Sequence, residues 1–152
     1  MKTYFSILLL LAVPLLAAGQ ETSHEYDSTL ASQLGADERG MKTYVLVILK
    51  TGPADIQDKE LRDSLFAGHF SNMDRLAAEK KLVLAGPMGA NDNQYRGLFL
   101  YDVKSPEEAM ELLEGDPTVT SGIFEVELYR WYGSAALPVH LETAKKISKR
   151  NP

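Results

Sequence analysis

The sequence predicts an α+β domain with the element order strand–helix–strand–strand–helix–strand. Three observations support this fold class. Residues 42–50, KTYVLVILK, form a nearly continuous aliphatic run, which is typical of a buried strand. From Asp58 onward the apolar spacing becomes helical, and residues 121–132, SGIFEVELYRWY, include alternating apolar and acidic positions. A chain of 152 residues that is 45% hydrophobic and 24% charged fits one globular domain.

Local signals delimit the first half of this order. After the strand at 42–50, Gly52-Pro53 marks a loop, and Asp58 is expected to be the N-cap of a helix. One apolar stripe of this helix comprises Leu61, Leu65, His69, Met73 and Leu76. Residues 82–87, LVLAGP, predict a short strand that ends at a proline.

The second half repeats the pattern. Residues 96–103, RGLFLYDV, predict a strand, and residues 105–108, SPEE, form a capping box with proline at the first helical position. The helix should end near Gly115, and residues 121–132 complete the sheet. This order is the ferredoxin-like βαββαβ arrangement, an antiparallel sheet with both helices on one face.

The face of the sheet without helices is expected to be apolar. YVLVIL (44–49) and GLFLYDV (97–103) carry bulky apolar residues at both odd and even positions, and therefore on both faces of the sheet. The apolar patch on the open face would be larger than monomeric proteins usually expose. A homodimer that pairs sheet against sheet would cover them. The alternative is that the C-terminal tail covers this face.

The two ends of the chain differ from the domain. Residues 1–19 have the charged start, apolar run and small-residue end of a secretory signal peptide, which predicts cleavage after Gly19 and an exported, periplasmic or secreted protein. An uncut membrane anchor is the alternative. Residues 20–41 are a polar leader or linker, residues 42–133 the domain, and residues 134–152 a basic tail with a short helix from about Leu141.

Composition excludes several function classes. The chain has no cysteine, so it has no disulfide, thiolate metal site or cysteine nucleophile. A net charge of −5 argues against nucleic-acid binding. Outside the N-terminus the sequence has no apolar run long enough to predict a membrane-spanning helix in the mature chain. Phosphate-loop, dinucleotide and nucleophile-elbow motifs are missing, and the three histidines lie far apart. We therefore expect no metal and no cofactor.

His69 and Asp116 are the candidate catalytic residues. His69 lies on the apolar stripe of the first helix, where a histidine is more often a hydrogen-bonded core residue than a catalyst. Asp116 follows the second helix, which should run beside the first, so the two side chains can approach. A carboxylate on one ring nitrogen would leave the other as a general base or acid. Alternatively, Asp116 only stabilises the turn before Pro117.

Two stretches, residues 68–87 and 116–131, resemble the YCII-related (YciI-like) family over about residues 43–132. The family pattern is a histidine on the first helix, A-G-P after the second strand, and D-P then a small residue and glycine before the last strand. Here these are His69, residues 85–87, Asp116-Pro117 and Ser121-Gly122. The resemblance implies a ferredoxin-like subunit, a dimeric α/β barrel and a His69–Asp116 site.

Two functions follow as hypotheses. In the first, the protein is a small cofactor-independent enzyme whose His–Asp pair transfers a proton on an unidentified small organic substrate, in an isomerase, lyase or dehalogenase-like reaction. Gly86, Pro87 and Met88 would then line the substrate cleft, although a turn that ends the strand explains them equally well. In the second, the protein is a non-catalytic dimer that binds a small ligand or serves in envelope stress.

Overall fold

A computed structural model describes residues 25–149 of the chain. The predicted signal peptide, residues 1–19, lies outside the described residues and stays a prediction. No helix within residues 25–149 is both long enough and apolar enough to cross a membrane. The elements in chain order are α1 (Ser28–Leu34), β1 (Met41–Thr51), α2 (Lys59–Ala78), β2 (Leu82–Pro87), β3 (Tyr95–Tyr101), α3 (Pro106–Leu113), α4 (Pro117–Thr120), β4 (Phe124–Ser134), the 3₁₀ helix η1 (Leu137–Val139) and α5 (His140–Ile147).

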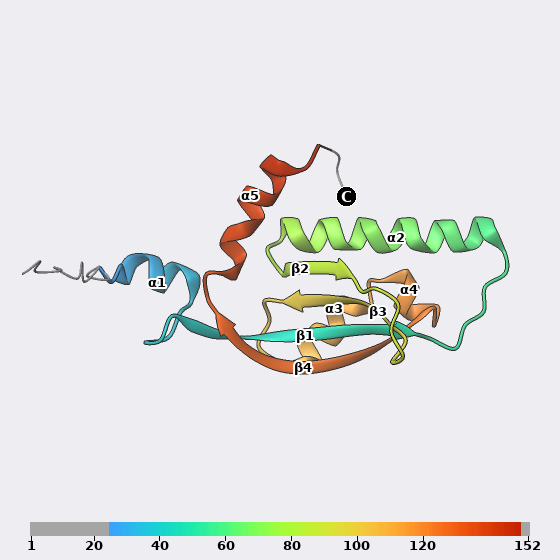
Figure 1. Ribbon diagram of the computed structural model, residues 1–152, viewed down its shortest axis with the longest axis horizontal. Coiled ribbons are helices and arrows are strands. Elements are labelled where there is room, and N and C mark those ends of the chain that lie inside the picture. The colour runs from blue at the N-terminus through green and yellow to red at the C-terminus, as the bar shows by residue number, and fades with distance from the viewer. Residues whose placement is uncertain (1–24, 150–152) are drawn as a thin grey trace, which may run out of the picture.

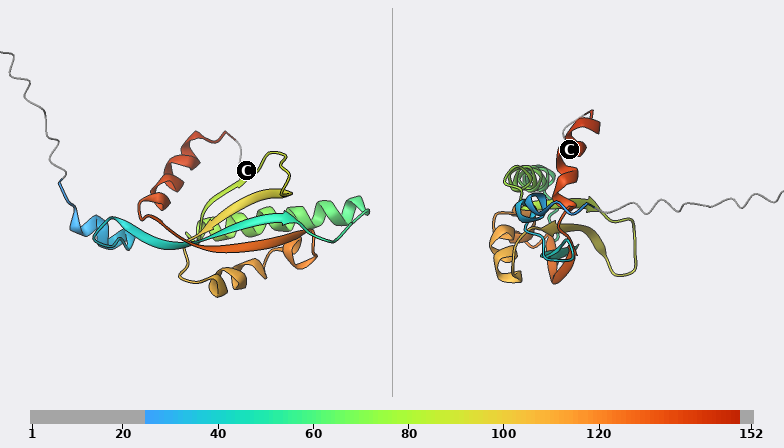
Figure 2. Two further views of the ribbon diagram at one scale, coloured as in Figure 1. Left: turned by 60° about the horizontal axis from the view of Figure 1, so that its bottom comes forward. Right: turned by 90° about the vertical axis from the view of Figure 1, so that its left-hand side faces the viewer.

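The four strands form one antiparallel sheet in the order β2-β3-β1-β4 (Figure 1). The central strand β1 pairs with β3 on one side and β4 on the other, so that Val47 lies between Phe99 and Leu128. Helices α2 and α3 lie on the same face of this sheet (Figure 2). The ferredoxin-like fold predicted from the sequence is therefore confirmed.

The main core lies between the sheet and its helices. Alternate residues of β1 (Val45, Val47 and Leu49) point into it and are almost fully buried. Leu76 of α2 and Leu113 of α3 are both completely buried against them. Burial of such side chains stabilises the fold by about 1.5–3 kcal/mol each.

Capping groups fix both covering helices where the sequence predicts them. At the start of α2, Asp58 accepts hydrogen bonds from the backbone N–H groups of Glu60 (2.9 Å) and Leu61 (3.2 Å). At the start of α3, Ser105 Oγ accepts from the N–H of Glu108 (3.3 Å). In turn, the Glu108 carboxylate accepts a hydrogen bond from the backbone N–H of Lys104 (3.2 Å).

Part of the predicted stripe on α2 is wrong. Leu61 is 50% exposed, and the buried residues of the helix are His69, Asn72 and Leu76. The first turns of α2 extend beyond the end of β2 (Figure 1), so that part of the stripe has no strand to pack against. The second half of the helix, which carries His69, Asn72 and Leu76, is the part that is buried.

Two segments have structure that the sequence interpretation missed. The polar leader contains α1, capped by Asp27 and ended by Gly35, whose φ of 69° is left-handed. The last strand begins at Phe124 rather than at residue 121, because a single helical turn, α4, occupies Pro117–Thr120. Asp116 is the N-cap of this turn.

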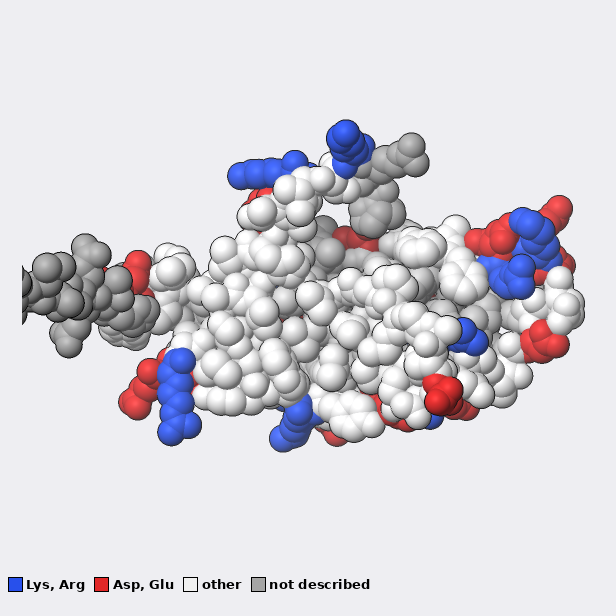
Figure 3. Space-filling view, viewed as in Figure 1, with Lys and Arg blue, Asp and Glu red and all other residues white. Residues whose placement is uncertain are grey.

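The opposite face of the sheet is largely uncharged. Figure 3 shows it, with uncharged residues over its centre and Lys, Arg, Asp and Glu mainly around the rim. At one end, Leu137 of η1 packs onto a small cluster of Tyr44, Val83 and Leu100. Helix α5 lies beside α2 and β2 instead, so the tail covers only one end of this face.

Candidate active site

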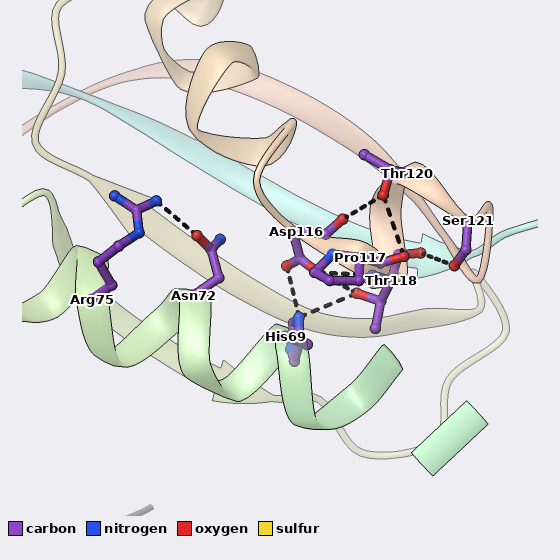
Figure 4. A network of polar contacts seen from close by, with 8 residues as sticks. All are labelled: His69, Asn72, Arg75, Asp116, Pro117, Thr118, Thr120 and Ser121. Atoms are coloured by element: carbon purple, nitrogen blue, oxygen red, sulfur yellow. Dashed lines mark hydrogen bonds and ion pairs between the residues drawn. The ribbon is translucent and has the colours of Figure 1, made fainter. Parts of the chain in front are cut away.

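His69 and Asp116 meet although they are 47 residues apart in the chain. His69 comes from the middle of α2 and Asp116 from the residue before α4 (Figure 4). The His69 Nδ1 atom lies 2.7 Å from Asp116 Oδ2, and the two side chains are 8% and 0% exposed. A hydrogen bond in such a buried setting is stronger than one in water.

A close approach of two helices brings this pair together. Gly68 stands beside His69, and a Cβ atom at Gly68 would lie 2.7 Å from Cγ of Pro117, closer than carbon atoms can pack. Because glycine has no Cβ, α2 can lie directly against α4. This contact sets the depth at which the His69 ring reaches the Asp116 carboxylate.

Thr118 completes the network around the carboxylate. Asp116 Oδ1 accepts from the backbone N–H of Thr118 (2.9 Å) and from its hydroxyl (2.7 Å). The hydroxyl oxygen also lies 3.1 Å from His69 Nδ1. Since this hydroxyl donates its proton to Asp116, its oxygen faces the ring as an acceptor.

This network determines the tautomer of His69. Both neighbours of Nδ1, the ionised carboxylate and the threonine oxygen, are acceptors. Nδ1 therefore carries the proton, and in the neutral ring Nε2 has a free electron pair. Nε2 enters none of these hydrogen bonds, which leaves it available to a substrate.

Asp116 is held in its ionised form. Burial by itself raises the pKa of a carboxyl group, but the hydrogen bonds from His69 and Thr118 outweigh that effect and hold the pKa of Asp116 below its ordinary value. The carboxylate therefore stays negative at neutral pH. It can stabilise the positive charge that His69 gains when Nε2 takes up a proton.

Aromatic side chains surround the imidazole ring. The rings of Phe66, Phe70, Phe99 and Phe124 have centroids 5.4–6.2 Å from that of His69. His69 forms part of the wall of a cavity of about 430 Å³, which also includes Gly86 and Pro87. That volume falls in the range of small-molecule sites, about 300–1,000 Å³. The site thus offers one base inside a predominantly apolar chamber.

The structure does not place all predicted cleft residues together. Met88 lies one residue beyond the cavity wall, where its N–H donates to the carbonyl of Arg96 (2.9 Å). Thr118 and the phenylalanines were missed by sequence reasoning. The signal for Thr118 was present, since Asp-Pro-Thr is a helix N-cap followed by proline at the first position.

The described residues offer no alternative centre for metal chemistry. Within residues 25–149, no three His, Asp or Glu side chains gather as metal ligands would. Near the end of α2, Arg75 donates to Asn72 Oδ1 (2.8 Å) and to Glu79 Oε1 (2.8 Å), and Glu79 is the C-cap of the helix. These contacts hold the helix beside Gly115 rather than forming a second site.

The fold and this pair define a small α+β protein with a buried, hydrogen-bonded histidine–aspartate pair at a largely apolar cavity. The model of the YCII-related domain matches residues 43–132, and the chain belongs to this family. The resemblance predicted from the sequence is thereby confirmed over the same residues.

Two known proteins are similar to this chain. The chain is 32% identical over 91 residues to the uncharacterized protein YjpA of Bacillus subtilis (strain 168), a match that covers 60% of this chain and 95% of YjpA. It is also similar to TftG, the 5-chloro-2-hydroxyhydroquinone dehydrochlorinase of Burkholderia phenoliruptrix AC1100, solved in complex with 2,5-dihydroxybenzoquinone. That likeness has a TM-score of 0.43 and 23% identity, and covers 58% of this chain and 92% of the other.

Proposed function

We propose that the protein is a cofactor-independent enzyme in which His69 transfers a proton on a small organic substrate. One observation carries the proposal: the ring that lines the cavity hydrogen-bonds a buried, ionised carboxylate through Nδ1, which leaves Nε2 as a base. Nε2 would take a proton from one atom of the substrate, and the imidazolium, stabilised by Asp116, would return it to another. Isomerisation uses both proton transfers. Elimination uses only the first: the substrate loses its proton to Nε2 as the halide leaves, and the imidazolium then gives the proton to solvent.

Replacing His69 by glutamine is expected to reduce turnover by about 10²–10⁴-fold, the usual contribution of a positioned proton-transfer group. The assay is proton NMR in D₂O on a panel of unsaturated lactones and chlorinated hydroquinones, which detects isomerisation, elimination and deuterium uptake together. His140→Gln is the matched control, because His140 is exposed on α5 and its ring nitrogen hydrogen-bonds the carbonyl of Leu137.

Equal turnover by the wild type and the His69→Gln variant would contradict the enzyme hypothesis. If the panel binds in the cavity but no member reacts, the other hypothesis from the sequence gains support: a non-catalytic dimer that binds a small ligand. In that case the His69–Asp116 hydrogen bond would be structural, and the variant would lose stability only.

We further propose that the protein is a homodimer paired through the open face of its sheet. On this face Leu46 pairs with Leu100 and with Tyr129, and Tyr44 pairs with Trp131. Tyr129 and Trp131 are 51% and 39% exposed on this open face, which is unusual for large aromatic side chains of a sheet. A second copy would bury them.

Substituting Tyr129 by glutamate is expected to raise the dimer dissociation constant at least about tenfold, because it places a charge in an apolar contact. Tyr132→Glu is the control. Tyr132 is 49% exposed on the same strand, but its position in the strand places it on the other face of the sheet. Sedimentation velocity measures both. A monomeric wild type, or dissociation by both variants alike, would contradict this interface.

A further inference from the structure

A charged side chain, Arg96, lies at the cavity that His69 lines. Among the described residues that line this cavity, only His69 and Arg96 have ionisable side chains. The others are hydrophobic or glycine, and they include the rings of Phe66, Phe99 and Phe124. An apolar site with two polar groups on its wall is typical of ligand cavities in which those groups set the orientation.

Arg96 is anchored but not neutralised. Its Nε donates to Thr51 Oγ1 (2.6 Å), which fixes the side chain to the end of β1. Within residues 25–149, no carboxylate forms an ion pair with its guanidinium, whereas Arg75 is paired with Glu79. The hydroxyl uses one of five donors, so the terminal nitrogens keep the planar arrangement that binds a carboxylate in a bidentate way.

Because the protein is negatively charged overall, the binding of an anion in the cavity depends on Arg96. The whole chain has a net charge of −5, so its surface as a whole does not attract anions. An anion that enters the cavity must gain its binding energy locally. Arg96, exposed at the cavity and next to an apolar wall, is the group that can supply it.

We propose that the cavity selects small organic acids, with an apolar ring-sized body between the phenylalanines and a carboxylate at Arg96. This inference rests on the proposed function only for the role of His69, which would face the carbon that exchanges a proton. Arg96 is then a residue that determines substrate charge, and it takes no part in the proton transfer.

Benzoate and benzamide test the proposal on the full chain, since they share a ring and differ in charge. At pH about 8.5, above the ordinary range of histidine titration, the wild type should bind benzoate about tenfold more tightly than benzamide. Arg96→Gln should weaken benzoate about tenfold and change benzamide less than about twofold. Ring-current shifts of the His69 proton signals, followed by NMR, place each probe in the cavity.

Two further variants keep the test decisive. Arg96→Lys retains the charge and should keep more benzoate affinity than Arg96→Gln, which separates charge from any effect on folding. Arg39→Gln removes an exposed arginine just before β1, at the opposite end of that strand, and should change neither affinity. Equal affinities for the two probes, an unaltered Arg96→Gln variant, or no shift of the His69 signals would overturn the proposal.

The outcome is independent of catalysis. In His69→Gln the preference for benzoate should persist, because Arg96 is unchanged. If that preference holds while no substrate turns over, the selection of organic acids stands and the proposed enzyme function fails. If turnover depends on His69 but neutral compounds bind equally well, the reverse is true.

Discussion

Replacing Asp116 by alanine is expected to lower the free energy of unfolding by about 3–5 kcal/mol, the cost of removing one partner of a buried pair. The carboxylate is fully buried, accepts from His69 and from both donors of Thr118, and caps α4. Its loss leaves those donors without an acceptor in the protein interior. Urea unfolding at pH 7 measures the change.

Asp58→Ala is the matched control for this prediction. Asp58 also caps a helix and also accepts two backbone hydrogen bonds, but it is exposed. Its replacement should cost about 1 kcal/mol, the usual value of an N-cap. If the two alanine variants lose the same stability, the buried pair contributes nothing beyond capping, and its energetic importance is refuted.

The same residue gives the protein a pH dependence with a defined sign. The folded pKa of Asp116 is lower than its ordinary value of 3.8, so its stabilising effect is fully present above that value and is lost as the pH falls through it and below. Asp116→Asn removes this dependence, whereas the other carboxylates titrate in both proteins. The stability difference between the two should therefore shrink from pH 7 to pH 3.

Replacing Phe99 by alanine should be equally damaging, at about 3–5 kcal/mol. Phe99 is 3% exposed, and its ring centroid lies 5.6 Å from that of Tyr101 and 5.8 Å from that of His69. It belongs to the main core and to the cavity wall at once, so its removal joins the cavity to a new void. Thermal and urea unfolding measure the loss.

Phe70 provides the comparison at the same cavity. Its ring is also close to His69, with centroids 5.4 Å apart, but half of the side chain is exposed. Phe70→Ala should cost less than about 1 kcal/mol, as surface substitutions generally do. A cost as large as that of Phe99 would show that Phe70 is buried in solution, against the exposure described here.

The elements were predictable where local signals are strong. The aliphatic run of β1 and the capping residues Asp58 and Ser105 each determine a structure within a few residues, and all three predictions are confirmed. The ferredoxin-like order follows from these elements, because the connections between successive strands and helices permit few arrangements.

The features that could not be predicted depend on contacts between residues that are distant in the sequence. The exposure of Leu61 reflects the extension of α2 beyond β2, which no helical periodicity reveals. The role of Thr118 depends on a single turn of helix, too short to leave a periodic pattern. In the sequence, Arg96 is an ordinary polar residue at the start of a strand, and only the folded chain brings it to the cavity that His69 lines.

The tautomer of His69 is the most direct test of the central claim, that Asp116 holds Nε2 ready as a base. Long-range ¹H–¹⁵N correlation spectra above the histidine titration range distinguish a protonated ring nitrogen from a bare one. We predict a proton on Nδ1 and a bare Nε2 in the wild type, and a changed tautomer in Asp116→Asn, whose side chain can itself donate. A proton on Nε2 of the wild type would contradict the account.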